Sequence, residues 1–151
     1  MSNEAQIQIS MNIDKQDDTG VLHYRAYPTQ FAADVDGNCG PTPGAIQVSK
    51  YGTDVDLSQL TTPGLCRLTN QDADFWVEYG INEPDTTKFY PLGELLPGEF
   101  FIIRLSRQLG SEYLTTGTGT GVSGSSDNKL RFRAEGDATR TCSVLIEAFE
   151  K

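Results

Sequence analysis

The chain of 151 residues has only three cysteines and one histidine, and this scarcity limits its metal and disulfide chemistry. Cys39, Cys66 and Cys142 are far apart and odd in number, and no pair shows a Cys-x-x-Cys spacing. One histidine, His23, cannot complete a typical zinc site without cysteine pairs at ligand spacing. We therefore expect buried or partly buried free thiols in a protein folded in a reducing cytosol. A disulfide with one thiol left over is the alternative. We expect His23 at the surface or half-buried on a strand, and no cofactor.

Long apolar runs are also missing. The longest lies around residues 100–103, whereas a membrane-spanning helix needs about 20 consecutive apolar residues. Residues 1–5 lack the basic and apolar regions of a signal peptide. We expect a soluble protein that has no membrane partner and does not enter the secretory route by itself.

Basic residues are few: 12 Lys and Arg stand against 21 Asp and Glu, which gives a net charge of −9. Binding to a nucleic-acid backbone needs basic side chains that displace counterions, so we expect no nucleic-acid partner. An acidic surface that keeps the protein soluble explains the charge most simply. A specific basic partner surface is the alternative.

Helical periodicity is absent too, and alternation of apolar and polar residues takes its place. Residues 5–13 place Ile7, Ile9, Met11 and Ile13 on one face and polar side chains on the other. Period two over this length predicts a half-buried strand. A polar turn ending at Gly20 leads to a second strand, which we expect Pro28 to stop. Together the two segments predict a hairpin.

The stretch from residue 63 to residue 107 organises the rest of the chain. Pro63-Gly64 has the order of a type II turn, and Leu96-Pro97-Gly98-Glu99 predicts a second one. Between them, strands at residues 65–70 and 75–80 around a polar turn predict a hairpin that carries the only tryptophan. After the second turn, alternation predicts core positions for three residues and an exposed Arg104. The core residues are Phe101, Ile103 and Leu105.

Turn signals every 8–12 residues, with fifteen Gly and seven Pro, predict an all-β fold. We expect an antiparallel β-sandwich, jelly-roll-like, in a single domain over residues 1–151. Residues 115–126 contain only Thr, Gly, Ser and one Val, which cannot bury enough apolar surface to fix themselves. We therefore expect a flexible Gly/Thr/Ser loop at about residues 110–128. Final strands are expected at residues 129–135 and 141–149, the last of them central or covered by a neighbouring subunit.

Two segments, one rich in glycine and one rich in aspartate, resemble ligand loops only in part. Residues 119–124 match Gly-x-Gly-x-x-Gly, but no strand precedes and no helix follows, as a dinucleotide site requires. Asp34, Asp36 and Asn38 resemble the first half of a calcium loop. An EF-hand needs Gly and Glu at later positions, where Cys39 and Ala45 stand. These three residues remain weak calcium candidates, and an ordinary turn is the simpler interpretation.

Two carboxylate pairs, Asp72 with Asp74 and Asp54 with Asp56, could in principle serve a glycosidase. The first pair lies in a predicted turn and the second along a strand edge. Solvated acids are therefore the better interpretation, and a hydrolase remains the weakest of the functional hypotheses. We expect no catalytic residues.

Aromatic residues cluster in the central stretch. Phe75 and Tyr79 follow the strand period, so core or subunit interface is the favoured interpretation for the cluster. An exposed cluster would instead form a sugar-stacking platform. The interface or binding candidates are Trp76, Tyr90 and Phe149.

A family resemblance rests on the order of these motifs over residues 60–149. The motifs are Pro63-Gly64-Leu65-Cys66-Arg67-Leu68-Thr69-Asn70-Gln71-Asp72, Phe75-Trp76-Val77-Glu78-Tyr79-Gly80, Phe89-Tyr90-Pro91-Leu92, Leu96-Pro97-Gly98-Glu99, Phe101-Ile102-Ile103-Arg104-Leu105, Leu130-Arg131-Phe132-Arg133-Ala134 and Val144-Leu145-Ile146-Glu147-Ala148-Phe149. In this order the chain resembles small structural virion proteins of tailed bacteriophages, of the head-decoration or tail-associated kind. Residues 1–60 do not take part in the likeness.

The resemblance implies a non-enzymatic structural protein that assembles in multiple copies on a phage particle. Its partners would be other virion proteins, such as major capsid or tail proteins, and further copies of itself. It would fold in the host cytoplasm and reside in the virion. The alternative hypothesis is a carbohydrate- or receptor-binding β-sandwich module that uses Trp76 or Tyr90 for stacking.

Overall fold

The computed structural model describes residues 5–17, 20–33, 35, 40–82, 88–106, 109, 129–136 and 139–150. Within these ranges the chain forms ten β-strands and no helix, and every strand pair is antiparallel. The predicted all-β, antiparallel class is therefore confirmed. No helix in the part of the chain described is long and apolar enough to cross a membrane.

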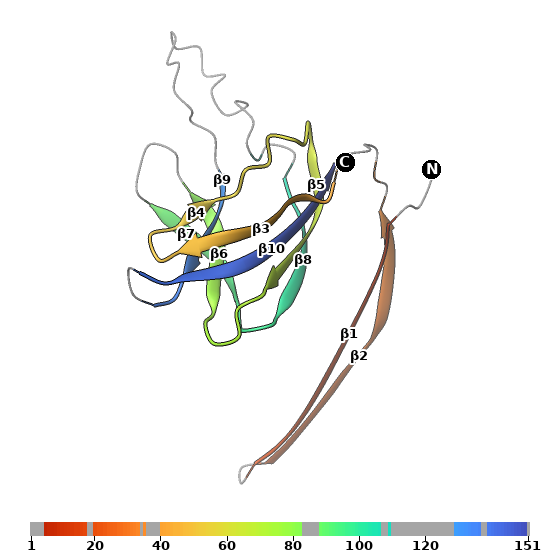
Figure 1. The fold of residues 1–151 in the computed structure, drawn as a ribbon. Helices are drawn as coiled ribbons and strands as arrows, with labels where there is room; N and C mark the ends of the chain where they lie inside the picture. Colours follow the sequence, from red (N-terminus) through yellow and green to blue (C-terminus); the bar gives the residue numbers. More distant parts are fainter. Residues whose placement is uncertain are drawn as a thin grey trace. The chain divides into compact units, whose positions relative to one another are not determined.

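The chain divides into two compact units, Met1–Val35 and Asp36–Lys151. The first contains β1 (Ala5–Asp17) and β2 (Gly20–Ala33), which pair as a long two-stranded ribbon (Figure 1). The other eight strands belong to the second unit. One domain over residues 1–151 stays a prediction, and the loop expected at about residues 110–128 lies outside the described residues.

The second unit is a sandwich of two four-stranded sheets. One sheet has the order β3 (Thr42–Ser49), β10 (Thr141–Glu150), β5 (Pro63–Asn70), β8 (Phe100–Arg104). The other has the order β4 (Thr53–Asp54), β9 (Lys129–Ala134), β6 (Val77–Asn82), β7 (Phe89–Leu95). The pairs β3–β10, β4–β9, β5–β8 and β6–β7 are nested in the sequence. Nested antiparallel pairs rolled into two sheets make a jelly roll, as predicted.

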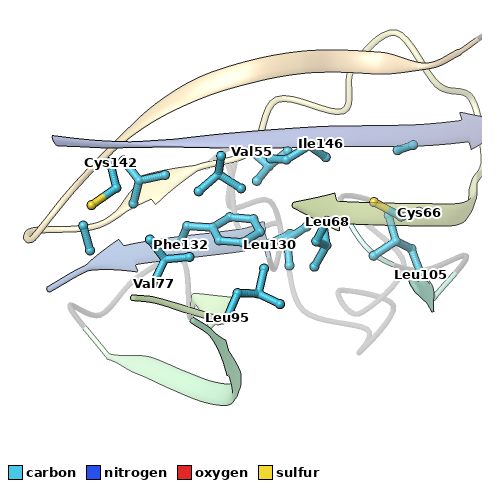
Figure 2. Close-up of a cluster of buried hydrophobic side chains, with 14 of the residues drawn as sticks. Val55, Cys66, Leu68, Val77, Leu95, Leu105, Leu130, Phe132, Cys142 and Ile146 are labelled. Atoms are coloured by element: carbon cyan, nitrogen blue, oxygen red, sulfur yellow. The ribbon is translucent and has the colours of Figure 1, made fainter. Parts of the chain in front are cut away.

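The core fills the space between the two sheets. Alternate residues of β10 and β9 point inward, so that Cys142, Val144 and Ile146 face the layer that contains Leu130 and Phe132. Figure 2 shows these strands contributing to one cluster together with side chains of β5, β6 and β7. Strand β10 lies between β3 and β5, which confirms the prediction of a central strand.

The two predicted Pro-Gly turns have different outcomes. Gly98 has a φ of +75°, and the Glu99 N–H donates to the Leu96 carbonyl at 3.0 Å, which confirms the second turn. The first prediction is wrong, because Pro63 and Gly64 open strand β5. Proline is tolerated at the first residue of a strand, and the Gly64 carbonyl accepts the Leu105 N–H at 2.8 Å.

The predicted hairpin around Trp76 is also wrong. Strands β5 and β6 lie in different sheets, and the connection between them crosses the sandwich. The buried Asn70 at the end of β5 holds this crossing, because its Nδ2 donates to the carbonyls of Phe75 (2.8 Å) and Leu95 (3.1 Å). The Asn70 side chain thus gives two backbone carbonyls the hydrogen-bond partners that they would otherwise lack where no hairpin ladder forms.

Some strand limits and one core position differ from the predictions. Strand β2 continues past Pro28, which lies where the register shifts between Ile9 and Met11, so its missing N–H breaks no ladder pair. Strand β4 ends at Asp54, although the alternation continues. Phe101 is 48% exposed, so its predicted core position is wrong, whereas Leu105 is buried. Phe101 lies on β8, an edge strand among those described, so its ring stacks on Tyr79 but no further strand of the described part lies beside it.

Candidate interaction surfaces

The three candidate binding aromatics lie on three different elements. Trp76 is half-buried just before β6, and its carbonyl accepts the Glu135 N–H at 3.2 Å. Phe149 is half-buried on β10 and packs against Gly40. A Cβ added to Gly40 would lie 2.9 Å from the Phe149 ring. Tyr90, on edge strand β7, is 49% exposed. Of the three, Tyr90 offers the most surface to a partner.

The weak calcium candidates Asp34, Asp36 and Asn38 lie outside the described residues. Among the residues that the structure describes, no group of three or more His, Cys, Asp or Glu side chains could hold a metal ion. His23 lies exposed on the ribbon, as expected, with its Nδ1 2.6 Å from Asp14 Oδ1.

The two carboxylate pairs have structural partners. Asp72 Oδ1 accepts the N–H groups of Asp74 and Phe75, each at 3.0 Å. These backbone hydrogen bonds, that from Asp74 foremost, lower the pKa of Asp72. Asp54 pairs with Arg131 across the β4–β9 ladder. These contacts place Asp72 in a turn and Asp54 on an edge strand, as the sequence predicted. The hydrolase hypothesis stays untested.

The cysteines described are free and buried, which confirms the prediction for Cys66 and Cys142. Burial, with the Glu147 carboxylate near it, raises the pKa of Cys66 to about 12. Burial and the neighbouring Asp72 raise the pKa of Cys142 as well. Both thiols therefore stay protonated at neutral pH and act as small apolar core groups. Cys39 lies outside the described residues.

The aromatic cluster of the central stretch belongs mainly to the core. Tyr79 lies between Phe101 and Phe132, with ring centroids 6.3 Å apart in each pair. Burial raises the pKa of its hydroxyl. Phe75 also packs on the core, and the Arg140 guanidinium covers its ring at 3.6 Å. The core interpretation is confirmed for Phe75 and Tyr79, which followed the strand period.

One margin of the sandwich exposes large apolar side chains. Among the described strands, β7 and β8 are the last of their sheets, and the turn at residues 96–99 joins them. Five apolar residues of these strands and this turn are between 46% and 67% exposed. We call this set the β7–β8 margin: Tyr90, Leu92, Leu96, Phe100 and Phe101.

Sequence reasoning found only Tyr90 of the β7–β8 margin as a binding candidate. A signal for the others was present, because residues 100–103 are apolar on both faces of a predicted strand. Such a strand is either buried on both sides or partly exposed at an edge. Strand order decides between these cases, and alternation carries no information on strand order.

The ribbon of the first unit has one apolar and one polar face. The register pairs Ile13 with Tyr24 and Ile7 with Phe31, and it pairs Gln8 with Gln30 on the opposite face. Six large side chains of the apolar side are between 40% and 54% exposed. We call this set the ribbon apolar face: Ile9, Met11, Ile13, Leu22, Tyr24 and Phe31.

Comparisons of the chain with protein-family models, with curated proteins and with solved structures gave no match. The jelly-roll topology and the two exposed apolar surfaces are therefore the observations on which a functional assignment rests.

Proposed function

We propose that the chain is a non-enzymatic structural virion protein that assembles in multiple copies on a bacteriophage particle, on its capsid or its tail. The observation that carries the proposal is the β7–β8 margin. Contiguous exposed apolar side chains are uncommon on monomeric proteins and mark protein contacts. Here five large apolar side chains, each about half exposed, lie on two consecutive edge strands and the turn between them, with Phe100 and Phe101 on opposite faces of β8.

The backbone of the same margin favours assembly. Strand β7 pairs only with β6, and β8 pairs only with β5, among the strands that the structure describes. Their outer edges can accept a strand of another protein. In such strand addition, backbone hydrogen bonds give affinity and side-chain pockets give specificity. Leu92 and Phe100 lie beside these edges and would supply the apolar contacts.

The fold supports this proposal by analogy alone. Jelly rolls occur in viral capsid domains, and they occur equally in lectins and cupins. A fold shared by unrelated functions does not choose among them. The choice of a virion role therefore depends on the exposed margin and on the motif resemblance over residues 60–149.

Purified particles of the phage that encodes the chain provide the first test. We expect mass spectrometry to detect the chain at a fixed ratio to the major capsid or tail protein. Cryo-electron microscopy of the same particles should place density for a jelly roll at a repeated position. Purified particles that contain no copy of the chain would overturn the proposal.

A matched pair of variants tests the margin itself. Leu92→Glu adds a negative charge on β7, and Ala45→Glu adds the same charge on β3, the edge strand farthest from β8 in its sheet. We expect Leu92→Glu to lower the number of copies per particle roughly tenfold, as loss of an interface hot spot does. Ala45→Glu should incorporate normally. Equal incorporation of both folded variants would show that the margin makes no contact.

A further inference from the structure

The ribbon apolar face extends along most of the two-stranded ribbon. Cross-strand partners share a face, so Ile9, Met11 and Ile13 of β1 lie on the same side as Leu22, Tyr24 and Phe31 of β2. Gln8, Asn12 and Gln30 lie on the other side. The register shift between Ile9 and Met11 skips one more residue on β2 than on β1 and keeps the apolar side chains together.

An uncovered ribbon of this kind is not stable in water by itself. A two-stranded hairpin is marginal unless further strands or a packed layer cover one face. Six large apolar side chains, each about half exposed, leave roughly 400 Å² of apolar surface in contact with water. A patch of this size on a monomer is commonly functional. Something therefore covers the face when the protein carries out its role.

The charge of the ribbon strands is compatible with a second copy as the cover. The chain as a whole carries a net charge of −9, but the two ribbon strands carry two acids, Asp14 and Asp17, and two bases, Lys15 and Arg25. Their net charge is therefore zero. Lys15 lies on the apolar face as the partner of Leu22, and the other charges of the strands balance it, so two such ribbons can pack together without a net like-charge penalty from the strands.

We propose that the ribbon apolar face packs against the same face of a second copy of this chain. Face-to-face packing about a two-fold axis is self-complementary and brings the apolar side chains of the two copies together, with Lys15, the partner of Leu22, near the turn end of the face. This contact uses a different surface from the β7–β8 margin and does not depend on the virion assignment.

The area available sets the strength of the contact. Thirteen residues in β1 span about 43 Å, and two strands are about 10 Å wide, so each ribbon has a footprint of roughly 430 Å². Two ribbons together would bury roughly 860 Å² if their surfaces were flat, and the uneven surface of the side chains adds to this area. Such a contact is at the low end of specific interfaces. We expect a weak dimer, with a dissociation constant in the micromolar range or above.

Sedimentation of the full-length protein over a range of about 0.1–100 μM, which covers the micromolar range, tests the proposal with a matched pair of double variants. Ile9→Lys/Ile13→Lys places two charges on the apolar face, and Gln8→Lys/Asn12→Lys places the same two charges on the polar face. We expect the wild type and Gln8→Lys/Asn12→Lys to dimerise. Ile9→Lys/Ile13→Lys should associate at least 100-fold more weakly while near-ultraviolet circular dichroism of the sandwich is unchanged. A dimer that persists in Ile9→Lys/Ile13→Lys would overturn the proposal.

Chemical cross-linking gives a second measurement that needs no disruption of the face. In a Cys39→Ser background, Met11→Cys lies near the middle of the face, and Asn12→Cys lies on the opposite side. Packed sheets are about 10 Å apart, so a bis-maleimide of about that length should join two Met11→Cys chains and leave Asn12→Cys chains unjoined. A wild-type monomer with protected Met11→Cys would mean that the chain covers its own ribbon. A monomer with reactive Met11→Cys would mean that no copy covers it, and either result overturns the proposal.

The two proposals fail separately. A dimer in solution that is absent from purified particles would overturn the virion role and leave the ribbon contact in place. A chain that is monomeric at all concentrations but present in particles would do the reverse.

Discussion

Asn70 has an unusual position for a polar residue, because it is fully buried at the point where the chain crosses from one sheet to the other. Its Nδ2 donates to two carbonyls, and its Oδ1 accepts the Asp72 N–H at 3.0 Å. Its own N–H donates to the Glu99 carbonyl at 2.9 Å. One side chain thus joins the end of β5, the crossing and the end of β7, and specifies how the two sheets connect.

We expect Asn70→Ala to lower the free energy of unfolding by about 2–4 kcal/mol, because the buried Leu95 carbonyl and the part-buried Phe75 carbonyl and Asp72 N–H lose their partner. Urea unfolding followed by Trp76 fluorescence measures this loss. Ala73→Ser, exposed in the same connection, should change stability by less than about 0.5 kcal/mol. A loss as small as that in Asn70→Ala would mean that water takes over these hydrogen bonds.

Cys66 makes stability depend on pH in the alkaline range. Its pKa is raised from 9.0 to about 12 in the folded protein, first by burial and then by the Glu147 carboxylate. The unfolded chain therefore loses the thiol proton first, so this contribution is complete below about pH 9 and is lost as the pH rises toward 12. We expect wild-type stability to fall more steeply than that of Cys66→Ala between about pH 9 and pH 11, by up to about 1.4 kcal/mol per pH unit. Parallel curves from denaturant titrations would contradict the burial of this thiol.

At the scale of elements, the sequence predicted strands better than it predicted their partners. The alternation at residues 5–13 and the turn around Gly98 are local features, and the structure confirms both. Pro63-Gly64 has the local order of a turn, but pairing of Pro63 with Glu150 places it in a strand. A partner so distant in sequence is set by the rolled topology, which neighbouring residues do not encode.

For the candidate surfaces too, local features could be predicted and features set by strand pairing could not. The two faces of the ribbon could be predicted from alternation, whereas their exposure could not, because a half-buried strand and a half-covered ribbon have the same period. Trp76 and Phe149 were chosen for residue type, and the structure places both half-buried. Leu92 was missed because its exposure results from its position on an edge strand.

Gly80 determines how closely strands β6 and β7 approach. A Cβ at this position would lie 2.1 Å from the Tyr90 carbonyl oxygen and 2.9 Å from Pro91 Cα, both backbone atoms. The register shift between Tyr79 and Gly80 lies at the same point. Only glycine permits this approach, so Gly80 was selected by packing and not by a turn.

We expect Gly80→Ala to lower the free energy of unfolding by about 2–3 kcal/mol, since β7 must move away from β6 to accommodate the methyl group. Because β7 carries Tyr90 and Leu92, the same variant should also reduce incorporation into particles. Glu94→Ala, exposed on the same strand, is the control and should change neither quantity. Thermal unfolding of Gly80→Ala that matches the wild type would show that the strand pair adapts without cost.

At the scale of the whole molecule, charge and apolar surface are separated. The ribbon strands have no net charge, so the net charge of −9 lies on the rest of the chain. Copies that assemble through the ribbon apolar face must bring these acidic parts closer together. The apolar contact favours the dimer, and electrostatic repulsion between the acidic parts opposes it.

Salt should therefore strengthen the dimer. Raising the ionic strength from about 0.01 M to about 0.15 M shortens the screening length from about 30 Å to about 8 Å. This weakens the repulsion between the acidic parts and leaves apolar packing of the ribbons nearly unchanged. We expect the dissociation constant from sedimentation to fall roughly threefold or more over this range, while Ile9→Lys/Ile13→Lys stays monomeric at both salt concentrations. A dimer that weakens with salt would mean that ion pairs hold the copies together, in place of the ribbon apolar face.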